Sequence, residues 1–215
     1  MKIHECEQGT IEWWNIRCRM PTASNFNRIL TPAKLEPSKQ ATDYALEIVA
    51  SRMYLAAGMA PQQVESYTSR DMQAGIDTEP EARARFQLSL PPGREVRTVG
   101  FLTDDHERIG CSPDGLIFDE DGIIEAGLEL KCPTLRVHLS YLMAATLPPE
   151  YRLQVHGSLA VSGLPAWCFV SYHPMARPLI LCVQPDETTE AIRTAAMEFV
   201  ASVDNIEHYF AKDAT

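Results

Sequence analysis

The sequence has no run of apolar residues long enough to cross a membrane. Residues 1–7 are polar and acidic, so we expect no secretory signal peptide at this end. These two absences predict a protein that acts in the cytoplasm and does not associate with membranes.

Paired cysteines are also absent. The six cysteines are scattered and none belongs to a CxxC pair, so no zinc-binding pattern is present. Cys111, Cys132, Cys168 and Cys182 lie in strand-like runs, where small buried thiols are common. We therefore expect all six cysteines to be reduced, with neither a disulfide nor a zinc site. Histidine clusters with metal-ligand spacing are lacking too, which weakens the hypothesis of a small-molecule metallohydrolase.

Positive charge is scarce, because 19 Lys and Arg against 29 Asp and Glu give a net charge of −10. This argues against a protein that coats nucleic acid nonspecifically, since phosphate binding needs local positive charge. It still allows a few arginines to line a channel in an otherwise acidic protein. A length of 215 residues with 45% apolar residues is typical of one soluble domain with a sizeable core, which we expect to span residues 1–215.

The most informative stretch is residues 127–133, Gly-Leu-Glu-Leu-Lys-Cys-Pro. Its alternation predicts a strand with Leu128 and Leu130 on a core-facing side. Glu129 and Lys131 then lie side by side on the other face, and the proline ends the strand because it cannot donate a ladder hydrogen bond. A carboxylate and an ammonium on one face can form a small site. A charged pair facing solvent is the alternative.

A second carboxylate joins this site if two strands pair. Segment 110–118 contains Asp114 and ends in an apolar run, and residues 119–122, Asp-Glu-Asp-Gly, are a strong turn signal. A hairpin closed there brings Asp114 beside Glu129. Two carboxylates in one place are costly unless a cation holds them, and Mg²⁺ or Mn²⁺ prefers such oxygen ligands. The alternative is a plain turn, because Pro-Asp-Gly is common in turns.

An arginine and two hydroxyls lie close together near the N-terminus. Residues 10–19 predict a short helix capped by Thr10, and Thr22 or Ser24 could cap the next one. Arg17 lies seven residues before Ser24. An arginine plus a hydroxyl at a helix start can form a phosphate pocket. An ordinary cap beside a surface arginine is the alternative.

A helix predicted over residues 71–86 carries an unusual carboxylate. Glu79, Arg83 and Phe86 share one face by their spacing, and Pro80 predicts a kink or a restart. A carboxylate on a core-facing stripe needs a partner. Glu79 therefore either joins a site or forms an ion pair with Arg83.

The remaining patterns predict the fold. Residues 147–159 predict a helix whose Gln154 can reach the site if the helix packs on the sheet; an exposed glutamine is the alternative. Further strands are predicted over 95–102, 166–172 and 179–183, and further helices over 38–57, 134–143 and 186–210. This order predicts an α/β fold with a central mixed β-sheet flanked by helices.

Pro113-Asp114 followed by Glu129-Leu130-Lys131 matches the PD-(D/E)xK nuclease signature. Segments 110–116 and 128–133 more narrowly resemble the lambda-type phage exonucleases, the YqaJ-like viral recombinases, and the resemblance covers about residues 10–210. It implies a restriction-endonuclease-like core. It also implies that Asp114, Glu129 and the backbone carbonyl of Leu130 hold Mg²⁺, with Mn²⁺ as the alternative ion. Lys131 would orient or deprotonate the attacking water, or stabilise the transition state.

The resemblance assigns roles to further residues. The pattern Gly-x-x-x-Glu-Pro-x-Ala-Arg resembles the family's helical motif, which implies that Glu79 joins the active site. The Tyr-x-x-Gln-Val setting implies that Gln154 helps to set the attacking water or the surroundings of the metal. A matching arginine and serine bind the 5′-phosphate of the DNA end in the family, which implies this role for Arg17 and Ser24, with Thr22 nearby.

The implied activity is processive 5′→3′ degradation of linear double-stranded DNA to mononucleotides, leaving a 3′ single-stranded tail. The resemblance also implies a homotrimer ring around DNA, a single-strand annealing protein as partner, and a role in phage or prophage recombination in the bacterial host cytoplasm. The acidic hairpin around residues 119–125 departs from the family, because it is longer than we expect.

Two other classes of function stay open. A PD-(D/E)xK endonuclease would cut closed circular DNA, which an end-dependent exonuclease cannot cut. A non-catalytic recombination scaffold would bind DNA ends without hydrolysing them, although Asp114, Glu129 and Lys131 are all present.

Overall fold

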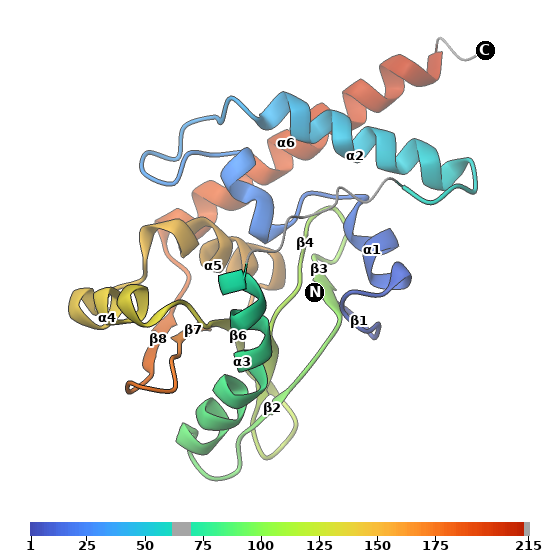
Figure 1. The fold of residues 1–215 in the computed structure, drawn as a ribbon. Helices are drawn as coiled ribbons and strands as arrows, with labels where there is room; N and C mark the ends of the chain where they lie inside the picture. Colours follow the sequence, from blue (N-terminus) through green and yellow to red (C-terminus); the bar gives the residue numbers. More distant parts are fainter. Residues whose placement is uncertain (62–69, 213–215) are drawn as a thin grey trace.

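The computed structural model describes residues 1–61 and 70–212. Its main sheet has the strand order β2–β5–β6–β7–β8 (Figure 1). Neighbouring strands are antiparallel except for β6 and β7, which are parallel. The five strands are β2 (Glu95–Arg97), β5 (Gly115–Phe118), β6 (Ile124–Lys131), β7 (Trp167–Ser171) and β8 (Leu179–Val183). The predicted central mixed sheet is therefore confirmed.

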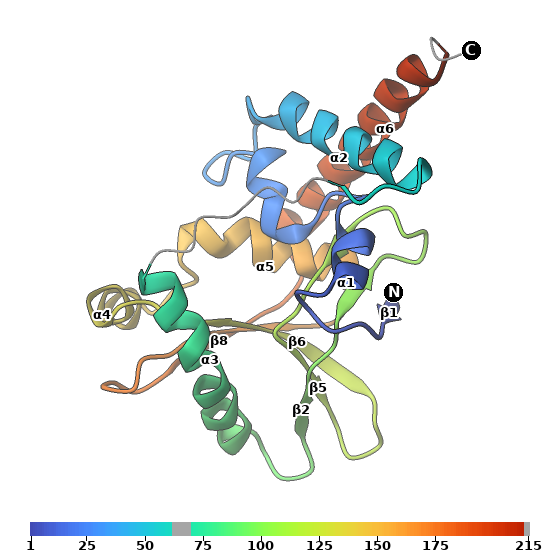
Figure 2. The same ribbon diagram turned by 45° about the vertical axis from the view of Figure 1, so that its right-hand side comes forward.

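Helices cover both faces of this sheet. Figure 2 shows α5 between the sheet and the crossed pair α2 and α6, with α3 running along the other side. None of the described helices has an apolar stretch able to cross a membrane. The helices are α1 (Ile11–Arg17), α2 (Ala41–Ala56), α3 (Arg70–Ser89), α4 (Leu135–Ala144), α5 (Pro149–Ser162) and α6 (Glu187–Lys212), with a short 3₁₀ helix η1 (Ala23–Arg28).

The alternation along β6 separates two hydrophobic clusters. Leu128 and Leu130 pack with Phe86 of α3 on one face of the sheet. On the other face Trp167 and Phe169 join the larger cluster, to which α5 contributes. Odd-numbered residues of β6 therefore face α5, so the sheet directs the polar residues of β6 toward a helix and away from open solvent.

The predicted strand over residues 95–102 is wrong. β2 pairs with β5 in the main sheet, whereas β3 (Phe101–Thr103) pairs with β1 (Lys2–His4) and β4 (Gly110–Cys111) in a second sheet. Gly100 lies at the break, where a Cβ would come within 2.0 Å of the carbonyl oxygen of Cys6. The predictions missed β1 and gave β4 only as a strand-like run around Cys111, because both strands are too short to show a strand period. α3 runs through Pro80, so the restart allowed there is not found.

The expectation of six reduced cysteines is wrong for one pair. Cys168 of β7 and Cys182 of β8 form a disulfide, and the other four cysteines are free. The two residues lie directly opposite each other in the antiparallel register, with Cα atoms 4.1 Å apart. A sequence with scattered cysteines does not show this pairing, because it depends on the register of two strands.

Two of the carboxylates in the acidic hairpin between β5 and β6 have partners in the structure. Asp119 accepts hydrogen bonds through Oδ1 from the backbone N–H groups of Asp121 and Ile123, at 3.0 and 2.8 Å. Glu125 forms a two-pronged ion pair with Arg94. The turn predicted at residues 119–122 is thus present, and its aspartate stabilises it.

Candidate active site

β6 presents the acidic and basic pair that its alternation predicts. Glu129 is only 2% exposed, and its Oε1 lies 2.5 Å from Nζ of Lys131 on the same face of the strand. A buried carboxylate is costly to desolvate unless it interacts with a cation, which the half-buried ammonium of Lys131 supplies here. The alternative of a solvent-facing pair is therefore excluded by the burial of Glu129.

Asp114 meets this pair across the hairpin, as predicted. Its backbone N–H donates to the carbonyl of Leu128 at 2.9 Å, and its Oδ2 accepts from the N–H of Leu130 at 2.6 Å. The backbone bond extends the β5–β6 pairing by one residue beyond β5, and the side-chain bond ties the carboxylate to the backbone of β6. The position of Asp114 relative to Glu129 is thus set by backbone register, which is the most rigid link available in this fold.

The electrostatics of this catalytic cluster, defined as Asp114, Glu129, Lys131 and Gln154, reflect two carboxylates in one buried place. Burial, together with the charge of Glu129, raises the pKa of Asp114 to about 8. Burial opposes the charge of Lys131, but Glu129 and Asp114 outweigh it, so the pKa of Lys131 is raised. Lys131 is therefore an ammonium in this arrangement. A further cation that neutralised the two carboxylates would stabilise the cluster electrostatically.

Gln154 reaches the cluster from the first half of α5. Its Nε2 donates to Oε1 of Glu129 at 2.6 Å. This oxygen therefore interacts with both the amide of Gln154 and the ammonium of Lys131. The alternative of an exposed glutamine is excluded by this contact, because the amide fixes the orientation of a buried carboxylate.

Glu79 lies beside the cluster and also forms the predicted ion pair. Its Oε1 is 2.7 Å from Nη2 of Arg83, and Nε of Arg83 donates to the backbone carbonyl of Asp114 at 3.1 Å. The pair is thus attached to the catalytic cluster through Arg83. α3 comes this close because of Gly75, where a Cβ would be 3.1 Å from the carbonyl oxygen of Cys132.

Arg17, Ser24 and Thr22 come together in a second group of polar side chains. Nη2 of Arg17 donates to Oγ of Ser24 at 2.5 Å, and Oγ of Ser24 is 3.4 Å from Oγ1 of Thr22. Thr22 is the N-cap residue of η1 but makes no side-chain capping bond. Burial lowers the pKa of Arg17, which nevertheless starts from a value high enough to keep the guanidinium charged.

The predictions missed Ser112 and Trp13 in this second group. Oγ of Ser112 accepts from Nη1 of Arg17 at 3.1 Å and from Nε1 of Trp13 at 3.0 Å. With two donors on its oxygen, the hydroxyl proton of Ser112 is free to donate elsewhere. Trp13 lies one helical turn before Arg17, whose guanidinium is 5.0 Å from the centre of the indole ring. We call Arg17, Thr22, Ser24 and Ser112 the arginine–hydroxyl pocket.

One cavity of about 170 Å³ joins the two groups. From the arginine–hydroxyl pocket it is lined by Arg17, Ser24 and Ser112, and from the catalytic cluster by Asp114, Glu129, Lys131 and Gln154. Its walls therefore carry a guanidinium and hydroxyl donors at one end and carboxylates with an ammonium at the other. The end with the guanidinium and hydroxyls suits an anionic group, and the end with the carboxylates would accept a second one together with a cation.

The carboxylates fit a divalent cation. Within the described part of the chain, Oδ1 of Asp114 and Oε2 of Glu129 accept no hydrogen bond. Among the described residues there is no group of three or more His, Cys, Asp and Glu side chains placed to hold a metal ion. Two carboxylates completed by backbone carbonyl and water oxygens are a donor set that Mg²⁺ accepts.

The family follows from a comparison with known domains. The model of the YqaJ-like viral recombinase domain matches residues 12–165, well over half of the chain. This chain belongs to the YqaJ-like viral recombinase family. The match includes every residue of the catalytic cluster and of the arginine–hydroxyl pocket. No curated protein matches this member of the family.

Solved structures of exonucleases are similar to this YqaJ-like chain. The alkaline exonuclease LHK-Exo from Laribacter hongkongensis is 26% identical, with a TM-score of 0.76 over 95% of this chain and 98% of that one. The same values hold for LHK-Exo in complex with dAMP. A phage-related exonuclease from Haemophilus somnus 129PT is 13% identical, with a TM-score of 0.55 over 86% of this chain and 95% of that one, and shares the fold.

Proposed function

We propose that this protein is a divalent-cation-dependent 5′→3′ exonuclease that degrades linear double-stranded DNA to mononucleotides and leaves a 3′ single-stranded tail. The observation that carries the proposal is the single cavity joining the arginine–hydroxyl pocket to the catalytic cluster. A strand end entering it can present its terminal 5′-phosphate to Arg17 while the next phosphodiester reaches Glu129 and Lys131. The alkaline exonuclease relative was solved with dAMP, a deoxynucleoside monophosphate of the kind we propose as product.

The arginine–hydroxyl pocket would set polarity. The guanidinium of Arg17 and the hydroxyls of Ser24 and Ser112 are donors that suit a terminal phosphate dianion. A 3′-end has no such group, and an internal phosphodiester carries one charge less. Binding at this pocket therefore selects the 5′-strand and fixes which phosphodiester bond lies in the catalytic cluster, so that each turnover releases one nucleotide.

The catalytic cluster would supply charge stabilisation. A Mg²⁺ or Mn²⁺ ion held by Asp114, Glu129 and the carbonyl of Leu130 would act as a Lewis acid on the phosphoryl oxygens. Lys131, kept as an ammonium by the two carboxylates, would stabilise the negative charge that develops in the transition state. Gln154 would hold Glu129 in its ligating orientation.

Glu79 would act from outside this set, since Arg83 links it to the backbone of Asp114. A role in positioning Asp114 fits this contact.

We also propose, from family membership, that the protein forms a homotrimer ring around the duplex and is processive for that reason. A single-strand annealing protein would then bind the 3′ tail during phage or prophage recombination in the bacterial cytoplasm.

The test is digestion of three DNA substrates in Mg²⁺: a linear duplex with 5′-phosphates, the same duplex with 5′-hydroxyls, and a covalently closed circle. We expect mononucleotides from the 5′-phosphorylated duplex, slower release from the 5′-hydroxyl duplex, and an intact circle. A cut circle would establish the endonuclease alternative. Bound DNA ends without hydrolysis in either Mg²⁺ or Mn²⁺ would establish the scaffold alternative.

A further inference from the structure

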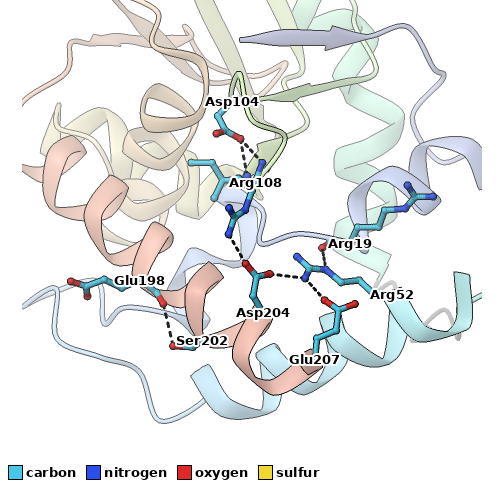
Figure 3. A network of polar contacts seen from close by, with 9 residues as sticks. Arg19, Arg52, Asp104, Arg108, Glu198, Ser202, Asp204 and Glu207 are labelled. Atoms are coloured by element: carbon cyan, nitrogen blue, oxygen red, sulfur yellow. Dashed lines mark hydrogen bonds and ion pairs between the residues drawn. The ribbon is translucent and has the colours of Figure 1, made fainter. Parts of the chain in front are cut away.

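Two arginines connect the walls of the arginine–hydroxyl pocket to α6 (Figure 3). Arg52 of α2 donates through Nε to the backbone carbonyl of Arg19, at 2.8 Å. Its Nη1 donates to Oδ1 of Asp204 at 2.9 Å and to Oε2 of Glu207 at 2.7 Å, both on α6. Arg19 lies just past the end of α1, two residues after Arg17. Arg52 therefore fixes the end of the helix that carries the pocket guanidinium.

The second arginine belongs to the opposite wall. Nη2 of Arg108 donates to Oδ2 of Asp204 at 2.6 Å. The backbone N–H groups of Arg108 and Ile109 donate to Oδ1 of Asp104, at 2.6 and 3.0 Å, which closes the turn between β3 and β4. From this turn the chain runs directly through β4 to Ser112. Ser112, whose hydroxyl faces Arg17, thus lies only four positions after Arg108 in the chain.

Asp204 links the two walls, because each of its oxygens binds a different arginine (Figure 3). At the other end of both paths, Nη1 of Arg17 lies 3.1 Å from Oγ of Ser112. We propose that Asp204 is a positioning residue that sets the separation of Arg17 and Ser112, and through it the preference of the enzyme for a 5′-phosphate. This inference rests on the proposed function of the pocket.

A purely stabilising role would have a different signature. The side chain of Asp204 is 45% exposed, and ion pairs this accessible to solvent contribute little to folding. The walls are also joined by a backbone bond from the N–H of Gly110 to the carbonyl of Pro21, at 3.0 Å, which does not involve Asp204. Loss of Asp204 would therefore leave the pocket assembled but shift its donors. Such a shift affects recognition of a phosphate and spares hydrolysis at an end that lacks one.

The experiment compares wild type with Asp204→Asn and with Glu198→Gln, a matched control that removes one carboxylate from the exposed face of the same helix. kcat/KM is measured in Mg²⁺ on duplexes with 5′-phosphate and 5′-hydroxyl ends, and binding of the same duplexes is measured in Ca²⁺. For Asp204→Asn we expect the 5′-phosphate preference to fall roughly tenfold in both measurements, at unchanged activity on 5′-hydroxyl ends. Glu198→Gln should keep the wild-type preference.

A double variant tests whether Asp204 acts through the pocket. In an Arg17→Ala background, Asp204→Asn should cause no further loss of preference, because the donor that it positions is already absent. Equal losses on both kinds of end, or a further loss in the double variant, would overturn the positioning role. If the wild-type protein binds 5′-phosphate and 5′-hydroxyl ends equally, both the phosphate-binding role of the pocket and the positioning role of Asp204 are overturned. If wild type prefers 5′-phosphates in Ca²⁺ but hydrolyses nothing, the nuclease proposal fails while the binding comparison still decides the role of Asp204.

Discussion

The catalytic cluster and the arginine–hydroxyl pocket share one cavity but are built differently. Asp114, Glu129 and Lys131 lie on or beside two neighbouring strands, where backbone hydrogen bonds fix their relative positions. Arg17 and Ser112 come from segments 95 residues apart and meet through side-chain contacts. In the proposed function, sheet register would therefore position the residues that hydrolyse DNA, and helix ends and turns would position those that recognise the DNA end. We expect variants of the catalytic cluster to lower kcat and variants of the arginine–hydroxyl pocket to change which DNA ends are used.

The largest effect should follow removal of the ammonium in the catalytic cluster. Lys131→Met should lower kcat on 5′-phosphorylated duplex roughly a thousandfold, because it removes the cation nearest the developing charge. Binding of the same duplex in Ca²⁺ should remain within about threefold of wild type, since Arg17 and its hydroxyl partners are untouched. More than a tenth of wild-type kcat in this variant would show that Lys131 is dispensable for hydrolysis.

The matching change in the arginine–hydroxyl pocket should act on end selection alone. Arg17→Ala removes a charge-assisted donor and should lower kcat/KM on 5′-phosphorylated ends roughly 10- to 100-fold, with little change on 5′-hydroxyl ends. Arg19→Ala is the control, because that side chain is exposed while its backbone carbonyl still accepts from Arg52. Equal losses on both substrates would contradict a phosphate-binding role.

Gln154 should have an intermediate effect that sharpens the division between the two groups. Gln154→Ala removes one of two donors to Oε1 of Glu129, so we expect kcat to fall about tenfold at unchanged 5′-phosphate preference. The measurement is single-turnover digestion of both end types. A changed end preference would place Gln154 with the recognition residues instead.

The smallest effect concerns stability and depends on pH. The raised pKa of Asp114, about 8, exceeds its unfolded value of about 4, so the folded protein favours the protonated carboxyl. The stability from this group is full below about pH 4 and is lost as pH rises through about 8. In EDTA, Asp114→Asn should therefore raise Tm by a few degrees over wild type at pH 9 and by less at pH 5. Mg²⁺ at pH 9 should stabilise wild type and not the variant.

The sequence predicted the catalytic cluster because its elements are local patterns. Alternation placed Glu129 and Lys131 on one face, and the turn at residues 119–122 brought Asp114 beside them. Burial of that face distinguishes a site from a surface ion pair. This burial depends on the packing of α5 against the sheet, which the sequence pattern of β6 does not show. The grouping of Arg17 with Ser24 was also predicted from their spacing, whereas their role in binding a 5′-phosphate was inferred from the family resemblance. The roles of these residues remain predictions.

Other features depend on segments that meet only in the folded chain. Ser112 stands two residues before Asp114, yet nothing in its own segment indicates that Trp13 and Arg17 converge on it. The register that pairs Cys168 with Cys182 is equally invisible. Strand 95–102 was predicted as one element because the contact between Gly100 and Cys6 involves residues far apart in the chain.

The parallel pairing of β6 and β7 decides where this family can change in length. A chain leaving Lys131 must cross back over the sheet before Trp167, and α5 is the returning segment. The place of Gln154 depends on how α5 packs, while the exposed residues Ala145 and Thr146 have only to connect α4 to it. Extra residues at this turn would lengthen a surface loop without moving α5. One extra residue inside β6 would turn Glu129 toward α3. Relatives should therefore vary in length at the α4–α5 turn and agree within β6.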